Sequence, residues 1–87
     1  RAVPLTAREF TVLRVLAEAH GAVVGSQQLI ASVWGDSLDG DERVLSACIY
    51  KLRKKIEPDP ARLRYLHTVL GQGIGYRLVD IAAVKDE

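Results

Sequence analysis

Apolar and polar positions alternate with the period of a helix near the start of the chain. Thr6 and Glu9 stand three residues apart before this run, a spacing typical of the capping box that begins a helix. Four apolar residues then recur at helical spacing: Phe10, Leu13, Leu16 and Ala17. Because Gly21 follows as a residue that commonly ends a helix, the pattern predicts a first helix over residues 7–20 with its apolar stripe in the core.

The middle of the chain predicts a brief strand and a second helix. Val23-Val24 is a β-branched pair between two glycines, which suits a short strand. Residues 26–34 carry a second apolar stripe, and Gly35 ends it. Residues 35–41 hold two glycines and three aspartates, which is the composition of a loop. Trp34, at the end of the second helix, is expected to be a buried anchor whose indole N–H needs a partner.

The third helix, from about Arg43 to Glu57, is the clearest element of the pattern. Asp41 suits its N-cap, and Pro58 pushes the residue before it out of the helical region. Its apolar residues form one narrow stripe: Leu45, Cys48, Ile49, Leu52 and Ile56. The stripe should be core, so Cys48 is expected to be a buried structural cysteine.

The last third of the chain changes to the period of strands. Residues 65–70 and 75–79 read as two strands, and the glycine-rich residues 71–74 read as the turn between them. A lone hairpin is barely stable in water, so this one must pack on the helices. The expected fold is α+β: one domain over residues 1–87, with three helices followed by a C-terminal β-hairpin.

Composition narrows the setting without indicating a function. The chain of 87 residues is 48% hydrophobic and 26% charged, which is ordinary for a soluble globular domain. No apolar run approaches the ~20 residues that a membrane span needs, and no signal peptide is recognisable at the start. The single cysteine has no disulfide partner. We therefore expect a cytoplasmic protein with no membrane association.

The distribution of charge is more informative than the net charge of +1. Residues 36–42 hold four acids and no base, whereas residues 43–55 hold five bases and no acid. At about 100° per residue, the face of the third helix opposite its apolar stripe is made by five residues. They are Arg43, Ala47, Tyr50, Lys51 and Lys54.

A helix that enters the major groove of DNA needs such a face. Lysine and arginine side chains reach phosphates, and a small residue such as Ala47 lets the backbone approach base edges or touch a thymine methyl group. The alternative interpretation is a helix that is only solvated on its outer face. That alternative explains the lysines but not the absence of acids, because exposed helices usually mix the two signs in i,i+4 pairs. The pattern therefore favours duplex DNA as the partner.

With helix and hairpin in view, the chain resembles the C-terminal effector domain of OmpR/PhoB-type response regulators from Leu5 to Leu78. Four motifs in order carry the resemblance: residues 5–13 (LTAREFTVL), residues 28–35 (QLIASVWG), residues 43–45 (RVL) leading to residues 51–56 (KLRKKI), and Thr68-Val69 with Gly75-Tyr76-Arg77. The resemblance implies a three-helix winged helix-turn-helix with a C-terminal β-hairpin wing. In this fold the third helix enters the major groove and the wing lies at the adjacent minor groove or backbone. It also implies a transcription regulator of a two-component system.

The resemblance adds site residues and partners. It implies DNA contacts from Arg53 and Thr68, and from Trp34 near the DNA and the base of the loop. Leu70 stands where the family's wing usually has an arginine, and the turn that contains Gln72 looks two residues longer than usual; both residues are expected at the DNA. The resemblance further implies head-to-tail dimers on direct repeats and contact of RNA polymerase with the loop from Gly35 to Asp41.

Two other functions are alternatives to sequence-specific DNA binding. The main alternative is a winged-helix protein-interaction module that contacts the transcription machinery with weak or no DNA specificity. An enzyme is disfavoured because no nucleophile–base pair, carboxylate pair or metal cluster is recognisable, and His20 and His67 have no evident helpers. No cofactor and no metal site are predicted.

Overall fold

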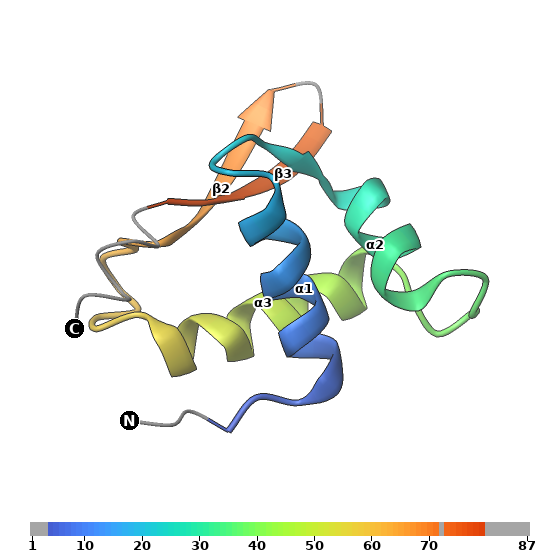
Figure 1. Ribbon diagram of the computed structural model, residues 1–87, viewed down its shortest axis with the longest axis horizontal. Helices are drawn as coiled ribbons and strands as arrows, with labels where there is room; N and C mark the ends of the chain where they lie inside the picture. The colour runs from blue at the N-terminus through green and yellow to red at the C-terminus, as the bar shows by residue number, and fades with distance from the viewer. Residues whose placement is uncertain (1–3, 72, 80–87) are drawn as a thin grey trace.

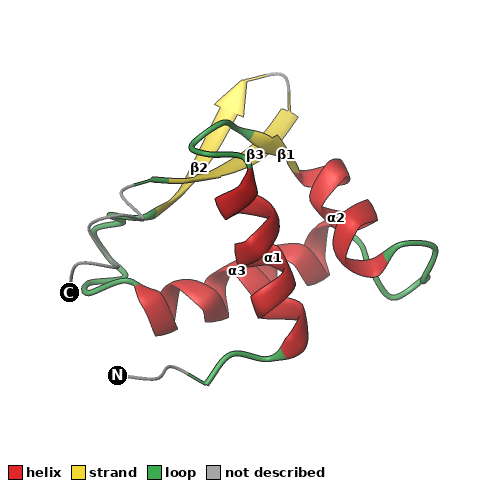
Figure 2. Cartoon of the chain, in the orientation of Figure 1, coloured by secondary structure: helices red, strands yellow, loops and turns green. Residues whose placement is uncertain are grey.

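Three helices and a small antiparallel sheet make up the computed structural model, which describes residues 4–71 and 73–79 (Figure 1). The elements follow one another along the chain as α1 (Ala7–Glu18), β1 (Val24–Gly25), α2 (Ser26–Trp34), α3 (Glu42–Ile56), β2 (Leu66–Gly71) and β3 (Gly73–Leu78). The strands lie together on one side of the helices, and the loop from α2 to α3 projects away from them (Figure 2). This is the predicted α+β winged helix.

The capping box of α1 is present as predicted. The Thr6 hydroxyl accepts from the Glu9 backbone N–H at 3.1 Å, and the Glu9 carboxylate accepts from the Thr6 N–H at 2.9 Å. The helix ends at Glu18, however, two residues before the predicted end. His20 and Gly21 have φ values of 51° and 88°, in the left-handed region that a helix cannot include. The interpretation of His20 as a helical residue was therefore wrong.

The other two helices lie where their stripes placed them. α2 has the predicted bounds, and Gly35 ends it with a φ of 60°. The Asp41 carboxylate caps α3 by accepting from the Val44 N–H at 2.8 Å. The chain leaves the helix at Glu57, whose ψ of 134° is extended because Pro58 follows. These cap predictions are confirmed.

The sheet differs from the predicted isolated hairpin in two ways. β1 lies at Val24–Gly25, one residue later than expected, and it pairs with β3 so that the sheet has the order β1-β3-β2. The predicted turn over residues 71–74 was wrong, because the strands run on to the pair Gly71↔Gly73. A φ of 103° at Gly73, which glycine adopts at no steric cost, permits this tight reversal. Gln72 lies outside the described residues.

The core forms where the inner faces of all three helices meet one face of the sheet. Its fully buried side chains come from every layer: Val12, Leu16, Leu29, Leu45, Ile49, Leu52 and Leu66. Tyr76 and Leu78 of β3 close it from the sheet side. Cys48 and Ile56, at the edges of the α3 stripe, are only half-buried, so the expectation of a fully buried cysteine was wrong.

A buried carboxylate joins the end of α3 to the start of β2. Glu57 is 6% exposed and accepts hydrogen bonds from the backbone N–H groups of Arg64, Tyr65 and Leu66, at distances of 2.8, 3.0 and 2.8 Å. A carboxylate that accepts several N–H bonds replaces the water lost on burial. The sequence around Glu57 and Pro58 indicates only a helix end, so it does not predict this role of Glu57.

A second buried carboxylate joins α1 to α3. Glu9, 3% exposed, receives the Lys55 ammonium at 2.6 Å. The hydrogen bond from Lys55 holds the pKa of Glu9 below its ordinary value of 4.5, against the opposing effect of burial. The pair therefore stabilises the fold at pH values above 4.5, and this contribution is lost as the pH falls through the lowered pKa of Glu9.

Replacement of Lys55 should reveal this pair. We expect Lys55→Met to lower the free energy of unfolding by about 1–2 kcal/mol near neutral pH. This loss in the free energy of unfolding is smaller than for a fully buried ion pair because Lys55 is 30% exposed. The difference from wild type should shrink in acid, as Glu9 becomes protonated. Urea unfolding across a pH series measures both effects. Lys54→Met is the matched control, and an equal loss in that variant would contradict the account.

The loop before α3 contains a glycine that packs against Trp34. A Cβ atom at Gly40 would lie 2.5 Å from the Cβ and Cγ atoms of Trp34, which is too close for any side chain. We expect Gly40→Ala to destabilise the protein by about 1–3 kcal/mol through overpacking. Gly71→Ala, where no atom lies within 4 Å, should be nearly neutral in the same thermal unfolding measurement. Equal stability of the two variants would show that Trp34 is free to move aside.

Candidate nucleic-acid interface

The outer face of α3 has the composition that the charge pattern predicted. Its five predicted residues are all exposed: Arg43, Ala47, Tyr50, Lys51 and Lys54. Leu45, Ile49 and Leu52, on the opposite side of the helix, are at most 1% exposed. The helix is therefore held to the core by one face and presents three cations around one alanine on the other.

Tyr50 is the one large aromatic on this face, and it is 61% exposed. The Lys54 ammonium lies 5.1 Å from the centre of its ring, a cation–π distance. This contact orders two exposed side chains one helical turn apart. The phenol hydroxyl remains a donor and acceptor at the surface.

Arg53 is only half-exposed, and it links α3 to the wing. Its Nε donates to the Leu66 carbonyl at 3.1 Å, and its Nη2 donates to the Thr68 hydroxyl at 2.7 Å. Burial lowers the pKa of Arg53 below its ordinary value, yet the guanidinium stays charged in proteins. The structure thus brings together two residues that the resemblance named separately. Both of these Arg53 bonds stay within the fold and position β2.

The wing places Leu70 at the surface beyond Thr68. Thr68 is exposed and Leu70 is 77% exposed. Because side chains alternate along a strand, both lie on the same face of β2 as buried Leu66. The predicted contact Gln72 lies outside the described residues. The wing therefore presents a hydroxyl and then an apolar side chain.

Trp34 is placed beneath the surface. Its side chain is 6% exposed, and the Arg8 guanidinium lies 5.2 Å above the ring centre. The indole Nε1 has no hydrogen-bond partner in residues 4–71 and 73–79, although a partner was expected. Trp34 thus meets the expectation of a buried anchor, and its ring supports Gly40 and Arg8.

Two charged side chains near α3, those of Arg8 and Glu42, are absent from the predicted interface. Arg8 and Lys51 line the same hollow of about 240 Å³, between the start of α1 and the outer face of α3. A cation in the first turn of a helix is repelled by the positive end of the helix dipole. This unfavourable position was the signal in the sequence that could have pointed to a role for Arg8. Glu42, the first residue of α3, accepts from the Ser26 hydroxyl at 2.7 Å and from the Gln27 amide at 2.5 Å.

Cys48 is not activated as a nucleophile, and the Nε2 atom of His67 is buried with no hydrogen-bond partner in residues 4–71 and 73–79. Burial is the main cause that raises the pKa of the Cys48 thiol, which makes it a weak nucleophile. Within residues 4–71 and 73–79 there is no group of three or more His, Cys, Asp or Glu side chains that could hold a metal ion. In the same part of the chain, no helix is long and apolar enough to cross a membrane.

Comparison with known proteins agrees with this geometry. Residues 1–78 match the family described as "Transcriptional regulatory protein, C terminal". The chain therefore belongs to this family of transcription-regulator domains. The match confirms the resemblance to OmpR/PhoB-type response regulators. This family is not an enzyme class.

Two curated relatives illustrate the family. The "DNA-binding dual master transcriptional regulator RpaA" of Synechocystis sp. is 37% identical over 73 residues, which are 84% of this chain and 30% of that protein. The "Sensory transduction protein RegX3" of Mycobacterium leprae is 42% identical over 77 residues, which are 88% of this chain and 38% of that protein. The chain thus spans about a third of the length of these relatives.

The link from Arg53 to β2 can be tested by removing each end of it. Arg53→Met keeps the alkyl chain and loses both hydrogen bonds, so we expect a loss of about 1–2 kcal/mol in unfolding free energy and faster amide exchange in β2. Thr68→Val loses one bond and should cost about half as much. Unchanged amide exchange in β2 of the Arg53 variant would contradict a positioning role for Arg53.

Proposed function

We propose that α3 enters the major groove of duplex DNA and recognises a specific sequence there, while the β2–β3 hairpin lies against the adjacent minor groove or backbone. DNA binding in transcription regulation is the function of this family of domains. The observation that carries the proposal is the outer face of α3, which is exposed, free of acids, and built of cations around Ala47.

Each residue of this face has a role that follows from its chemistry. Arg43, Lys51 and Lys54 neutralise phosphates or donate to acceptors on guanine, as cationic side chains do in the groove. Ala47 permits close approach of the helix and contacts a thymine methyl group. The Tyr50 hydroxyl has the reach to hydrogen-bond a base edge or a phosphate.

Residues outside α3 complete the proposed interface. Thr68 offers its hydroxyl to the DNA backbone from a position that the Arg53 guanidinium holds. Gln72 and Leu70 extend the contact at the wing tip. Trp34 acts from below the surface, by holding Arg8 near the hollow that Lys51 also lines.

The proposed partners beyond DNA rest on the loop between α2 and α3 and on the family. Leu38 is 100% exposed within residues 36–42, which hold four acids, so this loop offers RNA polymerase an apolar side chain ringed by negative charge. We propose this contact, together with head-to-tail binding of two copies on direct repeats and action in the cytoplasm.

A second candidate function is a protein-interaction module with weak DNA specificity. The observation that favours it is the stretch without charged residues between Thr68 and Tyr76, because Leu70 cannot neutralise a phosphate as an arginine would. Charge-reversing substitutions on the outer face of α3 distinguish the two functions. They weaken DNA binding strongly only if α3 enters the major groove.

The test is selection from a random duplex pool at two salt concentrations, followed by affinity measurements on the enriched site. We expect Lys51→Glu to weaken binding at least about tenfold and to reduce the salt slope by about one, because one phosphate contact is lost. Arg14→Glu makes the same change of charge on an exposed position of α1, and we expect an effect below about threefold.

The possible outcomes separate the two functions. An enriched repeat with the expected difference between the two variants supports sequence-specific regulation. Equal effects of Lys51→Glu and Arg14→Glu would contradict the placement of α3 in the groove. Absence of binding even at low salt would favour the protein-interaction module.

A further inference from the structure

The tip of the wing carries an exposed apolar pair. Leu70 and Ile74 are 77% and 44% exposed, and they are direct cross-strand partners in β2 and β3. No charged residue occurs anywhere between Thr68 and Tyr76. Leu70 and Ile74 together form contiguous exposed apolar surface at the end of the hairpin, which is typical of interaction sites.

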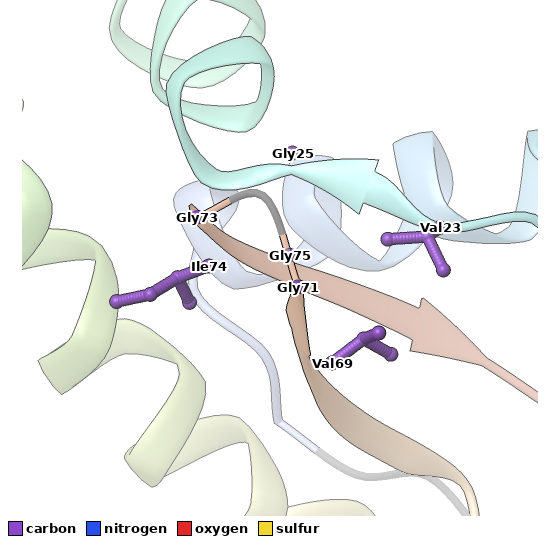
Figure 3. Close-up of a pocket in the computed structure, with 7 residues that line it drawn as sticks. All are labelled: Val23, Gly25, Val69, Gly71, Gly73, Ile74 and Gly75. Carbon is purple, nitrogen blue, oxygen red and sulfur yellow. The ribbon is translucent and has the colours of Figure 1, made fainter.

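The pair belongs to the face of the sheet that meets the helices. The partners Leu66↔Leu78, Thr68↔Tyr76 and Leu70↔Ile74 lie on one face, because side chains alternate along a strand. In Figure 3 the Ile74 side chain points toward α3, away from Val23 and Val69. Ile74 also lines a hollow together with Ser26, Gln27 and Glu42, at the starts of α2 and α3. Leu70 and Ile74 therefore continue the line that Thr68 begins beside α3.

The flanking glycines keep this tip thin. Gly71 and Gly73 are partners at the end of the hairpin, and a Cβ atom at either would meet no atom within 4 Å. With no side chains on these two residues, Leu70 and Ile74 are the bulk of the described tip. An edge without bulky side chains at its end can enter a minor groove about 6 Å wide.

The chemistry of DNA limits what such an edge can contact. A leucine cannot pair with a phosphate, and the thymine methyl groups lie in the major groove, which the proposed function gives to α3. What remains in reach beside α3 is the sugar wall of the minor groove and the base faces that an unstacked step exposes. Apolar side chains inserted there bend the duplex at steps that unstack easily.

We propose that Leu70, supported by Ile74, is an apolar minor-groove contact through which the protein selects DNA by deformability. This inference rests on the proposed placement of α3 in the major groove. Flexible pyrimidine–purine steps such as TA are favoured beneath the wing, and stiff A-tracts with a narrow minor groove are disfavoured. Because Leu70 carries no charge, this contact adds specificity without adding to the salt dependence.

The experiment compares wild type with Leu70→Ala and Leu70→Arg. Each protein is selected against the same random duplex pool, and affinities are then measured on two duplexes that share the major-groove site and carry either a TA step or an A-tract beneath the wing. Leu70→Ala should fold normally because the side chain is largely exposed, which circular dichroism checks. Val23→Ala, on the opposite face of the sheet and 50% exposed, is the matched control.

We expect wild type and Val23→Ala to prefer the TA duplex by about fivefold or more, within the range of one mismatched position. Leu70→Ala should lose this preference, and Leu70→Arg should favour the A-tract and steepen the salt slope by about one. Lys51→Glu should weaken both duplexes equally, which identifies a failure of the α3 placement separately.

Three results would overturn the proposal. One is equal affinity of wild type for the two wing duplexes while Lys51→Glu still weakens both. Another is a Leu70→Ala effect seen only on paired half-sites, which would make the apolar pair an interface between two copies. If Lys51→Glu weakens neither duplex, both the proposed function and this inference fail.

Discussion

Hydrogen bonds from side chains at the end of α3 to β2 and the residues just before it hold the wing in place relative to the outer face of α3. The Glu57 carboxylate gathers three backbone N–H groups where β2 begins, and the Arg53 guanidinium holds the Leu66 carbonyl and the Thr68 hydroxyl farther along. Both side chains leave α3 near its C-terminal end, so the helix itself carries the anchor points of the hairpin. A helix and a wing that bind one duplex together must keep this spacing, because small displacements break hydrogen bonds in the groove.

Acidic side chains near α3 bind groups within the fold, whereas basic side chains on its outer face are exposed. This difference explains how a chain of net charge +1 can present a basic face. Glu9 is paired with Lys55, Glu57 is buried at the strand start, and Glu42 accepts from Ser26 and Gln27. The negative charges closest to the helix thus act within the fold. The cations of the outer face are exposed, and three further acids, Asp36, Asp39 and Asp41, lie in the loop that precedes α3.

The sequence predicted what depends on local periodicity and caps, and it failed where distant partners decide. The bounds of α2, the Asp41 cap and the exposed face of α3 follow from spacing alone. The pairing of β1 with β3 and the extension of the strands to Gly71 and Gly73 depend on tertiary contacts. A carboxylate before a proline gives no hint of the N–H groups that Glu57 receives several residues later. The left-handed His20 was likewise invisible to a periodicity argument.

The central claim is that the outer face of α3 and the wing bind one duplex together, and a titration followed by NMR tests it most directly. The ¹⁵N-labelled domain would be titrated with the duplex enriched from a random pool. The account predicts that the largest amide shifts fall on Arg43, Ala47, Lys51 and Lys54 and on β2 near Thr68 and Leu70. Shifts confined to the loop between α2 and α3, or to the solvent side of α1, would contradict it.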